Sequence, residues 1–205
     1  MFQDRLDAGK QLADILENVD IVCSIPRGGI PIGYPICLKH KTKMTFAFPR
    51  KIGAPGHKEY AIGVINRFRD QFINESACQQ LKIDQAYIDQ ETANELNEIE
   101  KRQALYPCPV DDLTNQNVVI CDDGMATGFT MIAAVKEIER LNPKSITVAI
   151  PVCSKDAYSA VEKHCRVVTL STPDHFGAVG SFYREFPQVE YEEAKKLLDE
   201  INRLK

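Results

Sequence analysis

Short apolar runs alternate along the chain with segments whose apolar residues recur at helical spacing. The runs predict strands at residues 20–26, 43–48, 61–65, 118–121, 145–152 and 166–170. The spacing predicts helices at residues 4–18, 130–141, 154–164 and 190–204, and a looser helix at 84–106 that ends before Pro107 and Pro109. Alternating strands and helices are typical of a parallel, doubly wound sheet. We therefore expect an α/β protein in which residues 66–106 and 171–205 lie outside the sheet core.

The strand predicted at 118–121 runs directly into two carboxylates, Asp122 and Asp123, and then into the small-residue turn Gly-Met-Ala-Thr-Gly-Phe-Thr at 124–130. Open α/β sheets bind ligands at the carboxyl ends of their strands. A turn that leads into a helix presents unpaired N–H groups and the positive end of the helix dipole, which suits a phosphate. The carboxylates would repel a phosphate, so we expect them to accept hydrogen bonds from sugar hydroxyls and to reach Mg²⁺ through water.

A second turn with anion-binding character follows the strand predicted at 20–26. It carries Arg27 beside Gly28 and Gly29. Arginine offers a planar fork that matches phosphate, and the glycines expose backbone N–H groups to the same ligand. Such a turn is more often an ordinary surface turn, but its position after a core strand favours a ligand site.

A third candidate is the cationic segment Pro-Arg-Lys-Ile-Gly-Ala-Pro-Gly-His-Lys-Glu-Tyr at 49–60. Its turn-forming residues and positive charge suit a mobile lid, and Lys51 is the residue most suited to reach a bound anion. The alternative is a solvated loop whose charges only aid solubility.

The stretch at 118–130 resembles the phosphoribosyl diphosphate signature of the type I phosphoribosyltransferases. Together with the Arg-Lys-Ile-Gly-Ala-Pro-Gly run at 50–56, it is similar to a bacterial subgroup of predicted phosphoribosyltransferases, over nearly the whole chain. The resemblance implies one domain over residues 1–205. It also implies transfer of a 5-phosphoribosyl group from phosphoribosyl diphosphate to a nitrogen of a nucleobase or related acceptor, with release of diphosphate. Mg²⁺ would be bound through the substrate, without a direct set of protein ligands.

The same resemblance implies roles for individual residues. The acid pair would grip the ribose hydroxyls, the Arg27 turn would hold the diphosphate, and Lys51 would close over it. The residues expected to wrap the 5′-phosphate are Ala126, Thr127, Gly128, Phe129 and Thr130. Gly124 departs from the family, which usually has an aliphatic residue there, and we expect a looser turn.

The segment at 170–180 follows the last core strand, where this class of protein builds a hood over the nucleobase. Phe176 would stack on the base and Asp174 would hydrogen-bond its edge. A packed loop with a buried phenylalanine is an equal alternative. The helix at 84–106 shows no arrangement that suggests chemistry, and we expect a scaffold helix or an oligomer contact.

Composition narrows the remaining classes. With 205 residues, 44% hydrophobic and 26% charged, the chain has the composition of a soluble globular protein, and its net charge of −4 argues against nonspecific nucleic-acid binding. No apolar run approaches the ~18–20 residues that cross a bilayer, so we expect a cytoplasmic protein. The resemblance to phosphoribosyltransferases implies a role in nucleotide metabolism. The seven cysteines are odd in number and include no CxxC pair, so we expect reduced core residues, and the four histidines lack metal-ligand spacing.

Other functions stay open at this stage. A noncatalytic regulator that senses phosphoribosyl diphosphate or nucleotides would keep the donor site, although the sequence shows no broad basic stripe for nucleic acid. A phospho-acceptor receiver domain and a P-loop kinase fit poorly, since no later strand ends in an acceptor aspartate and no GxxxxGK[ST] occurs. The acceptor and the general base are not identified by the sequence. For the oligomeric state we expect a homodimer, the commonest assembly of soluble oligomers.

Overall fold

The computed structural model describes residues 1–106 and 112–203. Pro107, Cys108, Pro109 and Leu204, which the predictions above include, lie outside the described residues. No helix in the described part of the chain combines the length and the apolar character that crossing a bilayer requires. The six described cysteines are free; five are buried, and Cys165 is partly exposed.

The core is a five-stranded parallel sheet with the order β2-β1-β6-β7-β8, which confirms the predicted α/β class. Its strands are β1 (Ile21–Ser24), β2 (Lys43–Phe46), β6 (Asn117–Cys121), β7 (Ser145–Val152) and β8 (Arg166–Ser171). In the register, Ile21 lies beside Lys43 on one side and beside Val118 on the other. The order of the strands reverses between β1 and β6, which leave their carboxyl ends side by side. Open α/β sheets place their ligands at such a switch point.

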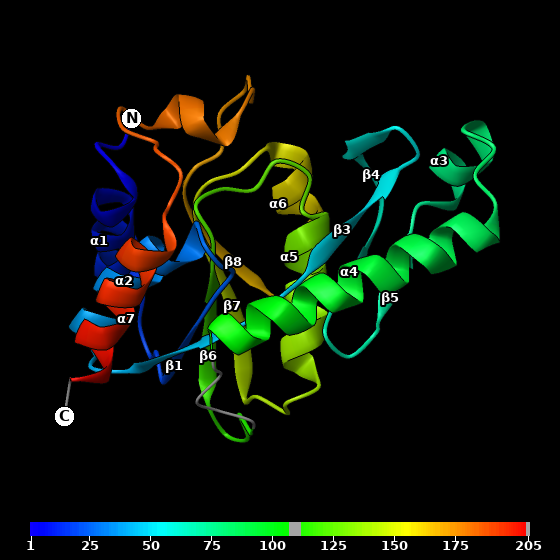
Figure 1. Ribbon diagram of the computed structural model, residues 1–205. Helices are drawn as coiled ribbons and strands as arrows, with labels where there is room; N and C mark the ends of the chain where they lie inside the picture. The colour runs from blue at the N-terminus through cyan, green and yellow to red at the C-terminus, as the bar shows by residue number, and fades with distance from the viewer. Residues whose placement is uncertain (107–111, 204–205) are drawn as a thin grey trace.

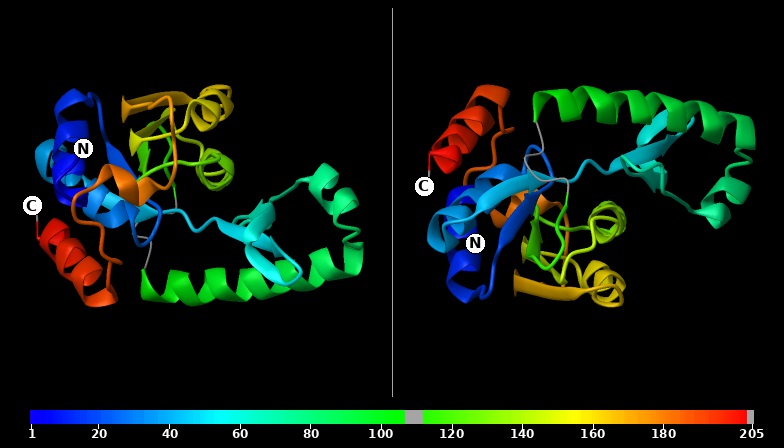
Figure 2. Two further views of the ribbon diagram at one scale, coloured as in Figure 1. Left: turned by 90° about the horizontal axis from the view of Figure 1, so that it is seen from above. Right: turned by 90° about the horizontal axis from the view of Figure 1, so that it is seen from below.

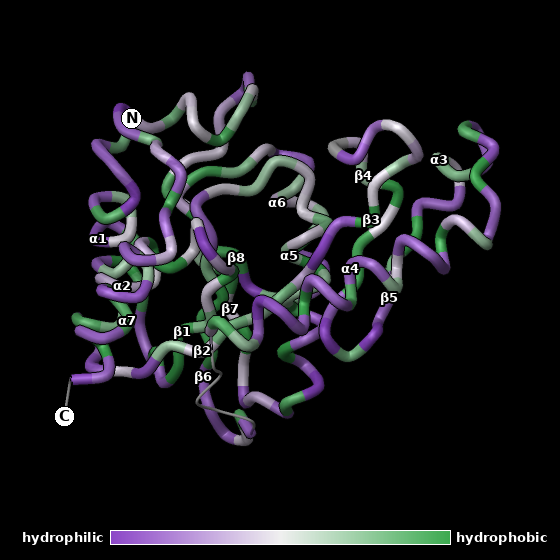
Figure 3. Tube along the Cα trace, viewed as in Figure 1, coloured by the Kyte–Doolittle hydropathy of each residue, from purple (hydrophilic) through white to green (hydrophobic). Residues whose placement is uncertain are grey.

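Helices cover both faces of the sheet, as Figure 1 and Figure 2 show. One layer consists of α1 (Arg5–Ile15), α2 (Gly29–His40) and α7 (Tyr191–Asn202), and the other of α5 (Phe129–Glu139) and α6 (Lys155–Glu162). Side chains alternate between the faces of a strand, so Val22 and Val119 enter the first layer while Cys23 and Ile120 enter the second. The strands are therefore apolar on both sides, and Figure 3 shows hydrophobic colour concentrated there.

A second unit, which we call the arm, extends from one edge of the core (Figure 2). It contains a three-stranded antiparallel sheet and two helices: β3 (Arg50–Ala54), β4 (His57–Ile65), β5 (Gln71–Ile73), α3 (Glu75–Gln80) and α4 (Gln85–Leu105). The strand predicted at 61–65 is therefore present, but in the arm and not in the core sheet. The cationic segment expected as a loop is largely a hairpin, because Pro55 and Gly56 form a tight turn with Gly56 at φ 73°.

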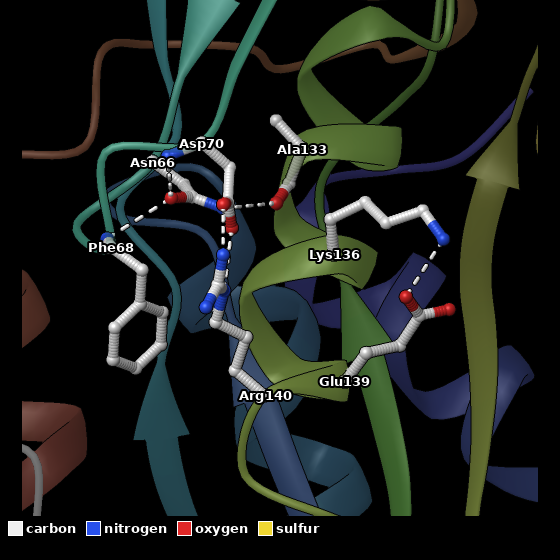
Figure 4. A network of polar contacts seen from close by, with 7 residues as sticks. All are labelled: Asn66, Phe68, Asp70, Ala133, Lys136, Glu139 and Arg140. Carbon is white, nitrogen blue, oxygen red and sulfur yellow. Dashed lines mark hydrogen bonds and ion pairs between the residues drawn. The ribbon is translucent and has the colours of Figure 1, made fainter.

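The arm is fastened to the core helix α5 through the turn between β4 and β5. The Asn66 side chain is fully buried and donates to the Ala133 carbonyl, at 3.5 Å, and to Asp70, at 3.1 Å (Figure 4). Asp70 also pairs with Arg140 at the end of α5, Nε to Oδ2 at 2.9 Å. These contacts connect the arm to the helix that begins at the 126–130 turn.

A buried carboxylate completes this attachment. Glu137 on α5 has no exposed surface, pairs with Arg67 Nε at 3.1 Å and accepts from the Phe48 N–H at 3.2 Å. Burial raises the pKa of Glu137 to about 7, although Arg67 opposes the shift. The attachment therefore contains a carboxyl group that titrates near neutral pH.

Glu137→Gln is expected to flatten the dependence of stability on pH between about 4.5 and 7. A carboxyl whose pKa is raised on folding stabilises the fold at low pH and loses that contribution as the pH rises toward the folded value. For this shift the loss is on the order of 3 kcal/mol. Urea unfolding across this pH range measures it, and an equally steep profile in the variant would contradict the assignment.

Candidate functional site

The carboxyl ends of β1 and β6 bring two turns together at the switch point. We call residues 26–29 the Arg27 loop and residues 126–130 the Thr127 loop, and the acid pair Asp122 and Asp123 stands between them at the end of β6. Ser24 Oγ, on β1, lies 3.3 Å from Cys121 Sγ on β6 and donates to the Gly29 carbonyl at 3.1 Å. The two loops thus start from strands that are joined side by side.

Asp123 is held by groups that the sequence prediction did not include. Arg5 Nε donates to Asp123 Oδ2 at 2.8 Å, and its Nη1 donates to the Pro187 carbonyl at 2.7 Å. The same guanidinium lies over the Phe186 ring, 3.7 Å from its centroid, while Tyr183 Oη donates to the Asp123 carbonyl at 2.6 Å. The first helix and the C-terminal segment therefore fix the second acid in position.

The surroundings of the acid pair disfavour the charged form of both carboxyl groups. Desolvation by the surrounding protein, and then the charge of Asp123, raise the pKa of Asp122 well above its ordinary range. Desolvation also raises the pKa of Asp123, against the opposing charge of Arg5. Sugar hydroxyls that donate hydrogen bonds, or a divalent cation, would relieve this crowding.

The Arg27 loop packs directly against the acid pair, because Gly28 has no side chain. A Cβ built on Gly28 would lie 2.4 Å from Asp123 Oδ2, and one on Gly29 would lie 2.5 Å from the Cys121 carbonyl. Gly28 has φ −58°, so it is needed here for space and not for its backbone freedom. The Pro26–Arg27 peptide is cis, and Arg27 is half-buried.

The Thr127 loop has the features of a phosphate cradle. Within the described residues, the N–H groups of Ala126, Thr127 and Gly128 donate to no protein acceptor. Gly128 caps α5 with φ 81°, and Ser154 Oγ donates to the Ala126 carbonyl at 2.7 Å. Thr127 and Phe129 are exposed and Thr130 is half-buried. Free N–H groups at a helix N-terminus suit an anion.

The C-terminal segment packs closely against Gly124, in the stretch at 118–130. A Cβ on Gly124 would meet Val179 Cγ1 at 2.4 Å, so the departure from the family pattern makes room for the 3₁₀ helix η1 (Val179–Phe182). The expectation of a looser turn is therefore replaced by close packing. Phe176 is half-buried and stacks on Phe182 at 5.3 Å, while the exposed Asp174 pairs with Lys155.

Gly124→Ala is expected to destabilise the protein by about 1–3 kcal/mol, because the new methyl group overlaps Val179. In a Val179→Ala background the methyl group finds space, so the same substitution should cost about 1 kcal/mol less. Urea unfolding of the four proteins measures this coupling. Gly177→Ala is the control, because its Cβ would have nothing within 4 Å, and equal costs in both backgrounds would contradict the packing.

A cleft of about 770 Å³ opens beside the Arg27 loop, between the core and the arm. Lys51, on β3, is exposed and lines this cleft, as does Thr130 of the Thr127 loop. A further part of the lining is the face of α4 that carries Asn94, Glu95, Asn97, Glu98, Lys101 and Arg102. The helix that was expected to be scaffold thus lines the cleft. These positions recur at three- and four-residue steps, a signal that was present in the sequence.

Arg5 offered no comparable signal. It is one basic residue in an otherwise ordinary amphipathic helix, 118 positions from its partner. The contacts of Tyr183 and Phe186 with the site likewise depend on how the C-terminal segment returns to the sheet edge. Only the folded chain brings these side chains to the acid pair.

A five-stranded parallel sheet with an acid pair and two glycine-containing turns at its switch point is typical of α/β proteins that bind nucleotides or sugar phosphates. Comparison with known sequences gives the family: the profile of the phosphoribosyl transferase domain matches residues 72–187. The chain therefore belongs to the phosphoribosyl transferase domain family.

Individual relatives agree with this family. A Mycobacterium tuberculosis protein classed as a candidate phosphoribosyl transferase, Rv0571c, is 31% identical over 210 residues, covering 99% of this chain and 47% of that protein. The chain thus spans about half the length of the curated relatives it matches. The crystal structure of TT1426 from Thermus thermophilus is 31% identical with a TM-score of 0.77, covering 97% of this chain and 98% of that one.

A more distant structure shares the fold alone. It is a Neisseria gonorrhoeae protein solved with bound ppGpp, 12% identical with a TM-score of 0.52, and the match covers 98% of both chains.

Proposed function

We propose that residues 1–205 form one phosphoribosyltransferase domain of the type I kind, in the bacterial subgroup with the Arg-Lys-Ile-Gly-Ala-Pro-Gly run. The reaction is transfer of a 5-phosphoribosyl group from phosphoribosyl diphosphate to a nitrogen of a nucleobase or related acceptor. The observation that carries the proposal is the contact between Gly28 and Asp123, which sets a diphosphate-type turn against two sugar-type acids at one switch point.

The donor would lie across the two loops. The N–H groups of the Thr127 loop and the hydroxyls of Thr127 and Thr130 receive the 5′-phosphate. Asp122 and Asp123 accept hydrogen bonds from the ribose hydroxyls, with Arg5 holding Asp123 at 2.8 Å. Arg27 binds the diphosphate, and Lys51, on the wall of the cleft, adds positive charge at the same end.

In the reaction, the bond between C1′ and the diphosphate oxygen breaks and the bond from the acceptor nitrogen to C1′ forms. The diphosphate leaves with the electron pair, and the acceptor nitrogen loses its proton to solvent or to a base that is not assigned. Mg²⁺ would be held chiefly by oxygens of the donor, with Asp122 and Asp123 as the residues able to bind its waters, and it would help to neutralise the charge of the leaving group. Positive charge at Arg27 stabilises the same developing charge.

The acceptor would sit beneath the C-terminal segment. Phe176 and Asp174 remain our candidates for base contacts, although the Phe176 ring already stacks on Phe182 and Asp174 pairs with Lys155. Both residues keep exposed surface beside these partners, and an acceptor would contact that surface. Because the chain spans about half the length of its curated relatives, the proposed activity is that of residues 1–205. The activity of a protein of the relatives' full length would be a separate proposal.

A panel of purines, pyrimidines and other amines, screened for diphosphate release with the donor and Mg²⁺, tests the proposal. Release with at least one acceptor, and its loss in the Asp122→Asn variant, is the expected result. Tight binding of the donor without release for any acceptor would favour the regulator that senses phosphoribosyl diphosphate or nucleotides. No binding of the donor would overturn the transferase and a regulator that senses phosphoribosyl diphosphate, and would leave only a regulator that senses nucleotides.

A further inference from the structure

The cleft between the core and the arm is strongly cationic. Five basic side chains line it, against two acidic ones: Arg50, Lys51, Lys58, Lys101 and Arg102 against Glu95 and Glu98. Both acids already have partners, since Arg50 Nε pairs with Glu95 at 2.5 Å and Lys101 with Glu98 at 2.6 Å. Lys58 pairs with Glu91, outside the cleft lining, at 3.6 Å. Lys51 and Arg102 are therefore the lining cations that take part in no ion pair among the described residues.

Arg102 stands out within this group because it lies against the Arg27 loop. Its Nη1 donates to the Pro26 carbonyl at 3.4 Å, so the last turns of α4 reach the residue beside Arg27. The side chain is half-buried, and it takes part in no ion pair among the residues that the structure describes. Its guanidinium is thus held near the loop with donors to spare.

The surroundings of Arg102 favour an anion. Burial lowers the pKa of its guanidinium, and the nearby charges of Arg50 and Arg27 lower it further, while Glu95 and Glu98 oppose the shift. Glu95 already pairs with Arg50, so the repulsion that remains is chiefly between Arg102 and Arg27, and a multivalent anion that binds between these two would relieve it. A guanidinium also binds two phosphate oxygens at once, which a lysine ammonium does in a less directional way.

We propose that α4 supplies Arg102 as a second diphosphate-binding arginine, opposite Arg27, so that the arm forms one wall of the leaving-group site. This proposal rests on the proposed function, because it takes the Arg27 loop as the place where the diphosphate binds. The helix at 84–106 then acts in ligand binding as well as in holding the arm together.

Calorimetry with magnesium diphosphate as the probe tests this role. Arg102→Gln should weaken diphosphate binding about ten-fold or more, the equivalent of one lost charge-assisted contact, and leave ribose 5-phosphate binding within about two-fold. Arg102→Lys should recover part of the affinity. The control is Arg166→Gln, which neutralises an exposed arginine at the amino end of β8. Thermal unfolding of each variant checks that the fold is kept.

The outcomes separate this proposal from the donor site itself. Unchanged diphosphate affinity in Arg102→Gln, together with a loss in Arg27→Ala, would overturn the role of α4 and leave the donor site standing. Equal losses of diphosphate and ribose 5-phosphate binding in Arg102→Gln would also overturn it, as a general disturbance of the site. If the unaltered protein fails to bind magnesium diphosphate, both proposals are overturned.

Discussion

Replacing Asp122 with asparagine is expected to weaken donor binding while making the protein more stable. The carboxylate accepts ribose hydroxyls in the proposed complex, and an amide with one acceptor oxygen should lower the affinity by about 10- to 100-fold. In the folded protein the same carboxylate is desolvated and lies beside the charge of Asp123, and both effects raise its pKa well above the ordinary range. Removing the charge relieves that repulsion.

The sign of the stability effect follows from the raised pKa. A carboxyl that binds its proton more tightly in the folded state than in the unfolded state contributes stability at low pH and loses it as the pH rises. The stability of the Asn variant relative to the unaltered protein should therefore increase as the pH rises. Each kcal/mol of repulsion that the substitution removes should raise the unfolding midpoint by about 2–4 °C. Such an exchange of stability for function is common at binding sites.

Donor binding by calorimetry and thermal unfolding at several pH values measure both effects. Asp199→Asn, on the exposed face of α7, is the matched control and should change neither quantity. A variant that binds the donor as tightly as the unaltered protein, or one that unfolds at lower temperature at neutral pH, would contradict the assignment of Asp122.

The sheet and its two turns were predictable because local signals determine them. Apolar runs of four to eight residues marked the core strands, and the residues after β1 and β6 carried the chemistry that the strand ends present. The adjacency of those strands was only a consequence of the expected fold class. Where a short apolar run could belong to either sheet, as at 61–65, no local signal distinguishes the two, and the structure assigns it to the arm.

Long-range contacts account for what the sequence left out. Gly124 was expected to loosen its turn. In the structure, Val179, which is 55 positions away in the chain, packs against Gly124 and leaves no space for a side chain there. Likewise the polar face of α4 was visible as a pattern, yet a polar helix face is ordinarily solvated, so only the cleft beside it gives the pattern a meaning. Sequence patterns predict individual helices and strands, whereas the function of a helix face depends on which parts of the folded chain lie opposite it.

Gly28→Ala is expected to damage the site, because the added methyl group enters the space of the acid pair. The new Cβ would lie 2.4 Å from Asp123 Oδ2 and 3.3 Å from Asp122 Oδ1, so it enters the space of both acids. Asp123 cannot simply turn away, because Arg5 Nε holds its carboxylate at 2.8 Å. Either the ion pair breaks or the Arg27 loop moves, and both separate the two halves of the proposed donor site.

The backbone itself does not oppose the substitution, since Gly28 has φ −58° and ψ −35°, which alanine adopts freely. The expected costs therefore come from overlap alone. We expect a loss of about 1–3 kcal/mol in unfolding free energy. We also expect donor affinity to fall by ten-fold or more, which corresponds to about 1.4 kcal/mol. Gly177→Ala, with an open site, should show neither loss.

A double variant separates packing from binding. Asp123→Ala by itself leaves the buried Arg5 without its ion-pair partner, so the cost of Gly28→Ala is compared in the unaltered protein and in an Asp123→Ala background. In that background the methyl group has space, and Gly28→Ala should cost much less stability. Donor affinity should not return in the double variant, because the ribose ligand is gone. Recovery of donor affinity would mean that Asp123 serves only to pack the loop, and an equal stability cost in both backgrounds would mean that the Arg27 loop and the acid pair are not in contact in solution.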